Sequence, residues 1–247
     1  MIQNKKTIFD LYDTIPSGYY DLVFNKNKGI QSKWHHLKFR FVLDKIGECD
    51  SLLDVGCSGG TLLSLLPSRV VAIGVDIAEE QIQYASERYK TDNHKFKRTT
   101  PNKPFDLDTQ FDVITMVELI EHLSKEETSF LLNECMKNLK PGGRLILTTP
   151  NYNSCWPILE GIVNIVADVS YENQHLTKYS RKRLHQLLEG HHFTNNNIHT
   201  FQYFASFAAF ANWNLADHIF NFENKLTANL SGGNLLLAVA EKPWNSD

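Results

Sequence analysis

The sequence predicts an α/β fold in which helices surround a doubly wound, mostly parallel sheet. Apolar runs of strand length alternate with helical segments over residues 48–150, and the first run ends in a glycine-rich turn. A third observation is the apolar run 234–241, which predicts a buried strand with residues 197–203 as its antiparallel partner. Together these patterns predict an open parallel sheet that is completed by a reversed C-terminal strand.

Length and composition predict a single domain over residues 1–247. A chain of 247 residues with 42% hydrophobic content can bury one sizeable core. Its predicted parts are a helical lead-in (1–47), the alternating core (48–150), a helical insertion (151–190) and a closing strand–helix–strand segment (195–242) with its helix over 204–222. No apolar run approaches the roughly 20 residues that a membrane-spanning helix needs.

The first strand of the core leads directly into a turn that is suited to a ligand. Residues 52–60 read LLDVGCSGG, and the segment TLLSLL follows with helical spacing. Glycines weaken a strand, but at a strand-to-helix junction they let the backbone approach a ligand closely. A plain tight turn between strand and helix is the alternative interpretation of the glycine pair.

The second strand, residues 70–75, ends in Asp76. An acidic residue at this place accepts hydrogen bonds from the hydroxyls of a ribose. The loop GCSGG lacks the Gly-x-Gly-x-x-Gly spacing that cradles a pyrophosphate, which disfavours a nicotinamide-dependent oxidoreductase. The pattern therefore favours a cofactor that contains adenosine but no phosphates.

The remaining elements of the core follow in regular alternation. Helical character covers residues 81–89 and 125–139, and a strand lies between them at residues 111–117. The residues KPGG at 140–143 end the second helix, as proline and glycine do near helix ends, and residues 144–149 form the fifth strand.

Four segments carry a specific resemblance: DVGCSGG (54–60), GVD (74–76), FDVITMVE (111–118) and LKPGGRLIL (139–147). In this order they resemble the signature segments of class I S-adenosylmethionine-dependent methyltransferases. The resemblance implies a Rossmann-like fold with S-adenosylmethionine as cofactor. It also implies a cofactor site that contains Asp54, Gly56, Cys57, Ser58, Gly60, Asp76, Ile77 and Met116.

The chain departs from the family pattern in two places. Ser58 stands where the family has the middle glycine of the loop, so its backbone must either avoid a positive φ or be strained. The stretch FKRTT at 96–100, followed by Pro101, lacks the acidic residue that often accepts the adenine amino group in the family.

The chemistry is expected where the fourth strand ends, because ligands of open α/β sheets lie beyond the carboxyl ends of the strands. Glu118, Glu121 and His122 follow that strand, and a helical turn beginning at Glu118 would place all three on one face. In one interpretation His122 satisfies backbone groups and the glutamates are solvated. In a second, His122 is a catalytic general base, assisted by Glu121. In a third, Glu118, Glu121, His122 and His175 bind a divalent cation.

A second resemblance concerns the acceptor. ELIEH (118–122), TPN (149–151) and HLTKY (175–179) resemble the O-methyltransferases of ubiquinone biosynthesis. They are also similar to small-RNA 2′-O-methyltransferases, which use Glu-x-x-Glu-His and a later histidine as a metal site. This chain lacks the second histidine of that later cluster and has a net charge of −3, so nucleic acid is not expected as a partner.

The acceptor that this second resemblance implies is a hydroxyl of a small molecule such as a phenol or catechol. A catalytically silent module that binds S-adenosylmethionine is the other alternative. It is disfavoured because Glu121 and His122 are retained.

The segments 151–190 and 204–222 are expected to form the acceptor side of the cleft. Trp34, His35 and His36 either close over the sulfonium, whose positive charge an aromatic face attracts, or pack between helices. The apolar amphipathic segments 156–166 and 203–213 cover an apolar acceptor, contact a membrane surface, or belong to the core.

Charge and cysteine usage give the setting. The sequence pI is near 6.4, which does not point to a nucleic-acid partner. Cys49, Cys57, Cys135 and Cys155 are scattered, without the spacing of a zinc site or a disulfide framework. With no secretory leader pattern in the sequence, we expect a reducing, cytoplasmic location.

Overall fold

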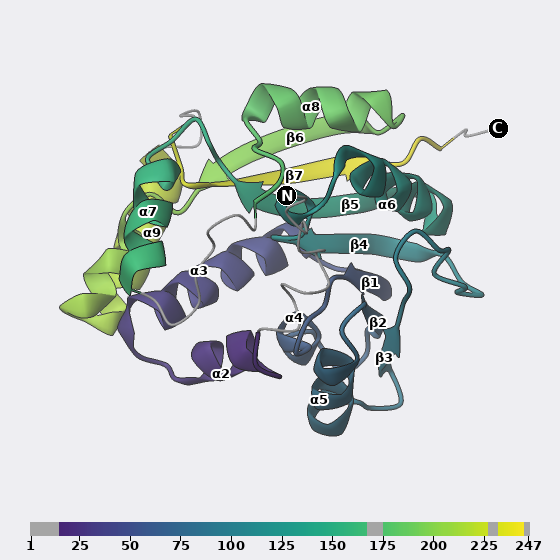
Figure 1. Cartoon of the computed structure of the whole chain (residues 1–247), viewed down its shortest axis with the longest axis horizontal. Coiled ribbons are helices and arrows are strands. Elements are labelled where there is room, and N and C mark those ends of the chain that lie inside the picture. Colours follow the sequence, from purple (N-terminus) through teal and green to yellow (C-terminus); the bar gives the residue numbers. More distant parts are fainter. Residues whose placement is uncertain (1–14, 167–174, 227–231, 245–247) are drawn as a thin grey trace, which may run out of the picture.

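The computed structural model describes residues 15–166, 175–226 and 232–244, and within them it contains one seven-stranded sheet. The strand order is β3-β2-β1-β4-β5-β7-β6, and β7 runs antiparallel to both of its neighbours (Figure 1). The strands are β1 (Ser51–Val55), β2 (Val71–Asp76), β3 (His94–Arg98), β4 (Phe111–Val117), β5 (Leu139–Pro150), β6 (Thr194–Phe201) and β7 (Leu235–Glu241). The predicted mostly parallel sheet with a reversed C-terminal strand is confirmed.

Helices precede, connect and follow these strands. They are α2 (Tyr19–Asn25), α3 (Gly29–Ile46), α4 (Thr61–Ser64), α5 (Glu79–Tyr89), α6 (Lys125–Asn138), α7 (Trp156–Val166), α8 (Arg181–Gly190) and α9 (Trp213–Leu226), with 3₁₀ turns η1 (Ile120–His122) and η2 (Ala205–Phe210). Among the described helices, none is both long enough and apolar enough to cross a bilayer.

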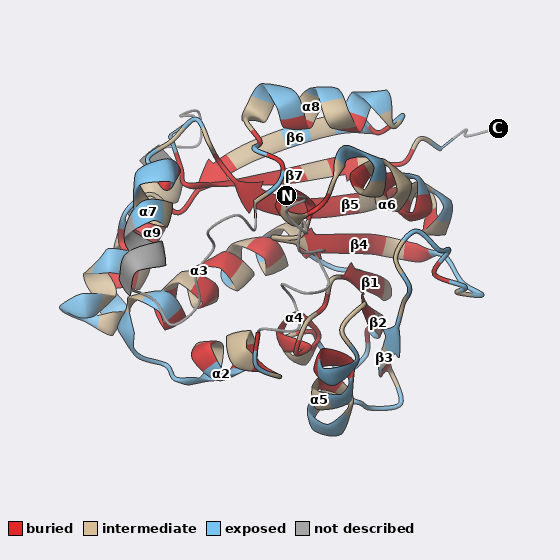
Figure 2. Ribbon diagram, viewed as in Figure 1, coloured by how far each residue is buried: buried red, intermediate tan, exposed pale blue. Residues whose placement is uncertain are grey.

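Different helices cover the two faces of the sheet. Because neighbouring residues of a strand point to opposite faces, they pack against different helices. On one face, Leu53 packs in a cluster with Leu132 of α6 and Leu184 of α8. On the other, Leu52 packs in a cluster that contains Leu37 of α3 and Phe220 of α9. Figure 2 shows the central strands as the buried centre of the molecule, with exposed residues on the edge strands β3 and β6 and on the outer sides of the helices.

The observed elements differ from the predicted ones in their boundaries. The fifth strand begins at Leu139 rather than at residue 144, because the backbone of residues 142–143 already pairs with Lys242 beyond β7. The helix predicted over 204–222 is broken into η2 and α9. Between them, the Asn212 side chain accepts hydrogen bonds from the backbone N–H groups of Asn214 and Leu215 and so starts α9.

Two predicted segments lie partly outside the described residues. The helical insertion 151–190 contains α7 and α8, and its residues 167–174 are not described. The lead-in 1–47 contains α2 and α3, and its residues 1–14 are not described.

The N-terminal helix α2 is anchored over the glycine loop by one buried carboxylate. Asp21 accepts hydrogen bonds from the hydroxyls of Thr61 (2.9 Å), Tyr84 (2.9 Å) and Tyr89 (2.8 Å). Gly18, which precedes α2 with φ 67°, has no room for a side chain, because a Cβ would lie 2.3 Å from the Tyr84 ring. The chain before the sheet therefore folds back onto α4 and α5 and closes one side of the space above the strands.

Candidate functional site

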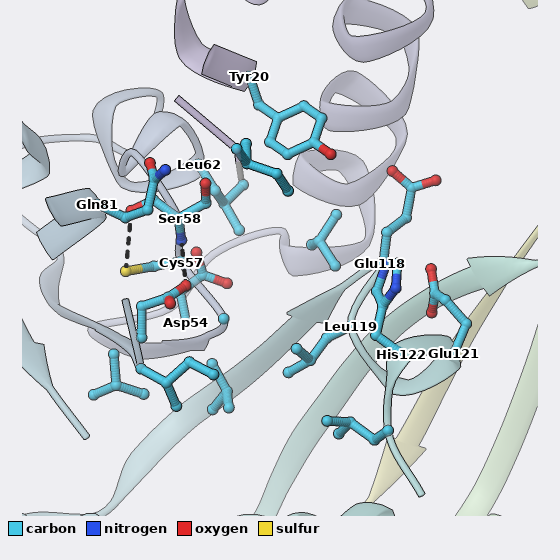
Figure 3. Close-up of a pocket in the computed structure, with 18 of the residues that line it drawn as sticks. Tyr20, Asp54, Cys57, Ser58, Leu62, Gln81, Glu118, Leu119, Glu121 and His122 are labelled. Carbon is cyan, nitrogen blue, oxygen red and sulfur yellow. Dashed lines mark hydrogen bonds between the residues drawn. The ribbon is translucent and has the colours of Figure 1, made fainter. Parts of the chain in front are cut away.

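A cavity of about 600 Å³ lies beyond the carboxyl ends of the central parallel strands, as expected for a ligand site in an open α/β sheet. Figure 3 shows the glycine loop with Asp54 and Ser58 on one side of it, and Glu118, Glu121 and His122 on the other. The same cavity is lined by Lys38 and Trp34 of α3, Trp156 of α7, His175 and Phe207 of η2. Residues from distant parts of the chain thus share one space.

The glycine loop needs its glycines for backbone geometry. Gly56 has φ 78° and Gly60 has φ 80°, both in the region that side chains with a Cβ avoid. Ser58, the residue that replaces a glycine, also has a positive φ, of 46°. The strained alternative therefore holds at Ser58, and its backbone N–H donates to Asp76 Oδ2 at 2.8 Å, which offsets part of that strain.

Asp76 connects the tip of β2 to the glycine loop. Its other oxygen, Oδ1, accepts from the backbone N–H of Ala78 at 2.9 Å. Burial raises the pKa of Asp76, and these backbone bonds oppose the shift. Each carboxylate oxygen retains acceptor capacity, so the group can still receive hydroxyl donors from a ligand in the cavity.

Asp54 ends β1 next to this loop and is buried. The Thr115 hydroxyl of β4 donates to it at 2.7 Å. Burial raises the pKa of Asp54 to about 7, and the charge of Asp76 adds to the shift. A cationic group placed in the cavity beside Asp54 would favour its charged form.

Some of the predicted cofactor-binding residues line the cavity and others do not. Gly60 and Met116 do not line the cavity. Gly60, which directly precedes α4, faces Phe96 and Ala85. Met116 is buried in the hydrophobic cluster on the face of the sheet that α6 and α8 cover. The predicted residues that do line it are Asp54, Gly56, Cys57, Ser58, Asp76 and Ile77.

Of the residues predicted near the sulfonium, Trp34 and His35 line the cavity, whereas His36 instead stacks on Phe24.

The predicted helical turn after β4 begins later than expected. Glu118 has φ 51°, and the helical residues are Ile120–His122 of η1. The carboxylate of Glu118 forms an ion pair with Lys38 of α3. Lys38 is buried and contributes to the cavity, a role that the sequence analysis missed.

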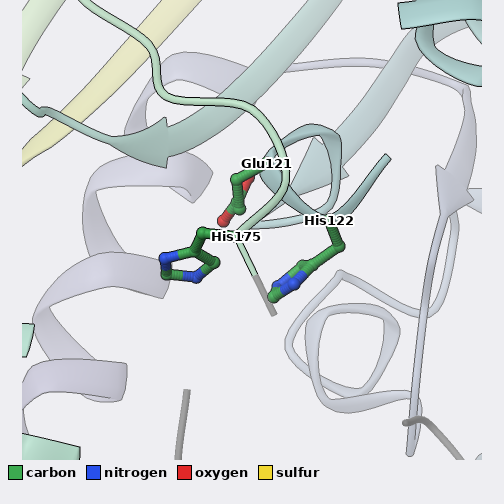
Figure 4. A group of neighbouring side chains, drawn as sticks. All are labelled: Glu121, His122 and His175. Carbon is green, nitrogen blue, oxygen red and sulfur yellow. The ribbon is translucent and has the colours of Figure 1, made fainter. Parts of the chain in front are cut away.

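Glu121, His122 and His175 converge instead. One ligand atom from each lies within 4.8 Å of the others, and the His122 and His175 rings are 5.0 Å apart (Figure 4). Glu121 is fully buried, and burial, together with the charge of Glu118, raises its pKa to about 8. Within the part of the chain that the structure describes, Glu121 Oε2 is buried without a hydrogen-bond partner.

The return of His175 to this place depends on backbone contacts. The N–H of Thr177 donates to the carbonyl of Glu121 at 3.0 Å, and its hydroxyl donates to the carbonyl of Leu123 at 3.0 Å. The N–H of Tyr152 donates to the carbonyl of Tyr179 at 3.0 Å, which ties the same segment to the end of β5. The two bonds of Thr177 join segments more than fifty residues apart, so no local sequence pattern reveals them.

His175 also has neighbours that the sequence analysis missed. Its Nδ1 lies 2.5 Å from Glu160 Oε1 of α7 and 2.8 Å from the Tyr152 hydroxyl. Burial lowers the pKa of His175, and Glu160 opposes the shift. Tyr152 directly follows the TPN segment that was singled out in the sequence, which is the one signal that points to it.

The comparison with known families decides the class of protein. A family described as a methyltransferase domain matches residues 27–198, which is more than half of the chain. The chain belongs to this methyltransferase family. Its cofactor is therefore S-adenosylmethionine. Asp54, Asp76 and residues of the glycine loop line the cavity with polar groups.

Individual methyltransferases agree with this assignment. A ubiquinone biosynthesis O-methyltransferase from Pseudomonas fluorescens is 28% identical over 122 residues, which are 47% of this chain and 52% of that protein. The chain thus spans about half the length of the curated relatives it matches.

Two solved methyltransferases share the fold. A SAM-dependent methyltransferase from Archaeoglobus fulgidus has a TM-score of 0.62 at 21% identity, covering 91% of this chain and all of that one. A possible histamine N-methyltransferase from Thermotoga maritima has a TM-score of 0.66 at 16% identity, covering 96% of this chain and all of that one.

Proposed function

We propose that this methyltransferase transfers the methyl group of S-adenosylmethionine to a hydroxyl of a small molecule. The observation that carries the proposal is one cavity in which the glycine loop faces the group formed by Glu121, His122 and His175. Transfer from a sulfonium is an in-line displacement, so the protein must align two molecules, exclude water and remove one proton. The names of the curated relatives support oxygen as the methylated atom.

The proposed reaction needs only one proton acceptor from the residues of this cavity. A lone pair of the acceptor oxygen forms the bond to the methyl carbon, and the electrons of the carbon–sulfur bond pass to sulfur. The acceptor then loses its hydroxyl proton, for which His122 is the proposed catalytic base with Glu121 beside it. The products are the methyl ether and S-adenosylhomocysteine.

The same three side chains fit a divalent cation. A buried carboxylate oxygen without a hydrogen-bond partner in the described residues, next to two imidazoles, is a donor set that suits Mn²⁺, Fe²⁺ or Zn²⁺. Such a cation would supply Lewis acidity to an acceptor oxygen. Glu121, His122 and His175 would hold it, whereas Glu118 would join them only after leaving Lys38.

The acceptor is proposed to carry an apolar part. Trp34 and Trp156, whose rings are 5.7 Å apart, and Phe207 form the wall of the cavity on the acceptor side. Phe210 is 88% exposed and Phe222 is 64% exposed on η2 and α9, which extends the apolar surface outside the cavity. We also propose a cytoplasmic location and peripheral contact with a membrane. Co-sedimentation with lipid vesicles tests the membrane contact.

Calorimetry with S-adenosylhomocysteine tests the cofactor site. We expect binding in the micromolar range and negligible binding of NAD. The change Asp76→Ala removes the acceptor for ribose hydroxyls and should weaken binding by about 1–3 kcal/mol. Asp92→Ala, in the exposed turn after α5, is the control and should leave the affinity unchanged. Equal affinities in both variants would mean that the ribose lies elsewhere.

Chelation and histidine variants distinguish a cation from a base. If the cation proposal holds, His122→Ala and His175→Ala each abolish binding of Mn²⁺ or Zn²⁺, and exhaustive chelation stops methyl transfer without changing cofactor affinity. His185→Ala, on α8 outside the cavity, is the control. If chelation has no effect and His122→Ala alone slows transfer by about 10²–10⁴-fold, His122 acts as a base without a metal.

A further inference from the structure

His175 is held by two side chains that lie outside the group formed by Glu121, His122 and His175. Its Nδ1 lies 2.5 Å from Glu160 Oε1, and the side chains of His175 and Glu160 are only 6% and 16% exposed. The Tyr152 hydroxyl lies 2.8 Å from the same Nδ1 and 3.1 Å from Glu160 Oε1. The three groups therefore lie at hydrogen-bond distance from one another.

The hydrogens among these three groups can be assigned from the number of donors. Tyr152 has one hydroxyl hydrogen, which a phenol keeps at neutral pH. The carboxylate of Glu160 only accepts, and it receives the tyrosine hydrogen. Nδ1 of His175 lies next to the same carboxylate, so it must carry a hydrogen to form a bond there. The neutral ring then has its lone pair on Nε2.

We propose that Glu160 and Tyr152 are positioning residues. They fix His175 with its hydrogen on Nδ1, which leaves the lone pair on Nε2 for the group that His175 forms with Glu121 and His122. The proposal rests on the proposed function for the consequence of this arrangement, since a lone pair on Nε2 is what a cation or an acceptor proton requires. Figure 4 shows the His175 ring beside Glu121 and His122.

The arrangement makes α7 part of the site. Trp156 and Glu160 are four residues apart, so they lie on the same face of this helix. Trp156 lines the cavity, and its ring is 6.4 Å from that of His175. The helix that forms an apolar wall on the acceptor side thus also supplies the carboxylate that orients the histidine.

The first experiment reads the tautomer directly and needs no cation. Nitrogen-15 NMR of the full chain, metal-free at neutral pH, should show His175 with its hydrogen on Nδ1. In Glu160→Ala we expect both tautomers, and in Glu160→Gln the amide can donate to Nδ1 and so raise the share with hydrogen on Nε2. Glu189→Gln is the matched control, since Glu189 pairs with Nδ1 of exposed His185 at 3.1 Å.

The second experiment measures Co²⁺ or Zn²⁺ binding by calorimetry. Loss of an orienting partner of a histidine ligand typically weakens metal binding by 10–100-fold, and we expect this range for Glu160→Gln and Glu160→Ala. We expect a smaller effect for Tyr152→Phe, because Glu160 still contacts Nδ1. Unchanged affinity for S-adenosylhomocysteine and an unchanged melting temperature would show that the variants are folded.

The outcomes separate this inference from the proposed function. If the unmodified protein binds no cation, the cation proposal fails, while the tautomer measurement still decides the role of Glu160. A wild-type His175 with its hydrogen on Nε2, or the same single tautomer in Glu160→Ala, would overturn the inference.

Discussion

Two buried carboxyls in the cleft, Asp54 and Glu121, have pKa values of about 7 and about 8. For both, burial is the largest cause, and a neighbouring carboxylate adds to it. Each group is therefore largely protonated in slightly acidic solution when the cavity holds no cation. Strongly perturbed pKa values of this kind cluster at functional sites, and both groups line the same cavity.

Asp54 leads to a prediction about pH and stability. Because its folded pKa is raised from 3.8 to about 7, the native state prefers the protonated form, and this contribution is complete below about pH 4. It is lost as the pH rises through 7, at a cost of roughly 4 kcal/mol or less. In Asp54→Asn, which stays neutral, we expect this loss to be absent.

Urea unfolding of cofactor-free protein at pH 5 and pH 8 measures the effect. Asp54→Asn should gain stability relative to the wild type between the two values. Asp50→Asn, at an exposed position before β1, should follow the wild type. Parallel behaviour of Asp54→Asn and wild type would show that Asp54 is already charged at pH 5.

The residues of the site were predictable only near the motifs. The glycine loop and Asp76 were found because local backbone geometry determines them. Met116 was placed in the cofactor site by resemblance, but strand alternation turns it to the opposite face from Val117. Lys38 and Glu160 were missed because their roles depend on tertiary contacts with residues 80 and 15 positions away.

At the scale of elements, the docking of α2 is the contact that shapes the cofactor side. Three hydroxyls converge on Asp21, and the chain reaches this position through a glycine with no space above it. Element types were predicted well from periodicity, whereas boundaries depended on bonds such as the Asn212 cap of α9, which periodicity does not contain.

Gly18→Ala tests this docking. The new methyl group would meet the Tyr84 ring, so α2 must shift, and we expect a lower melting temperature together with weaker binding of S-adenosylhomocysteine. Gly29→Ala is matched to it, because Gly29 also has a positive φ, of 81°, but nothing lies within 4 Å of its added Cβ. The difference between the two variants isolates the contact with Tyr84. Identical melting temperatures and affinities would mean that α2 adjusts without consequence.

At the scale of the whole molecule, the cavity divides into a side formed by the sheet and its loops and a side formed by helices. The parallel core was predictable because strand and helix patterns alternate regularly there. The acceptor side was predicted only as the two segments 151–190 and 204–222, because the residues of α7 and η2 that line the cavity are brought there by tertiary contacts.

Hydrogen exchange tests this division. Without acceptor, we expect the described amides of α7 and η2 to exchange faster than those of β4 and β5, because α7 and η2 are partly exposed and line the cavity. Adding S-adenosylhomocysteine should slow exchange in the glycine loop and α2 first. Uniformly slow exchange through α7 and η2 in the free protein would instead identify them as ordinary core.

The position of β7 has a consequence for how the protein is made. This strand comes after β6 in the chain but lies between β5 and β6 in the sheet. During synthesis on the ribosome, β6 emerges first and has no neighbour in the sheet until β7 follows. The strands up to β5 can assemble as the chain grows, while β6 must wait with its backbone unpaired. We therefore expect a nascent chain stalled before residue 235 to have a protease-resistant core that excludes β6.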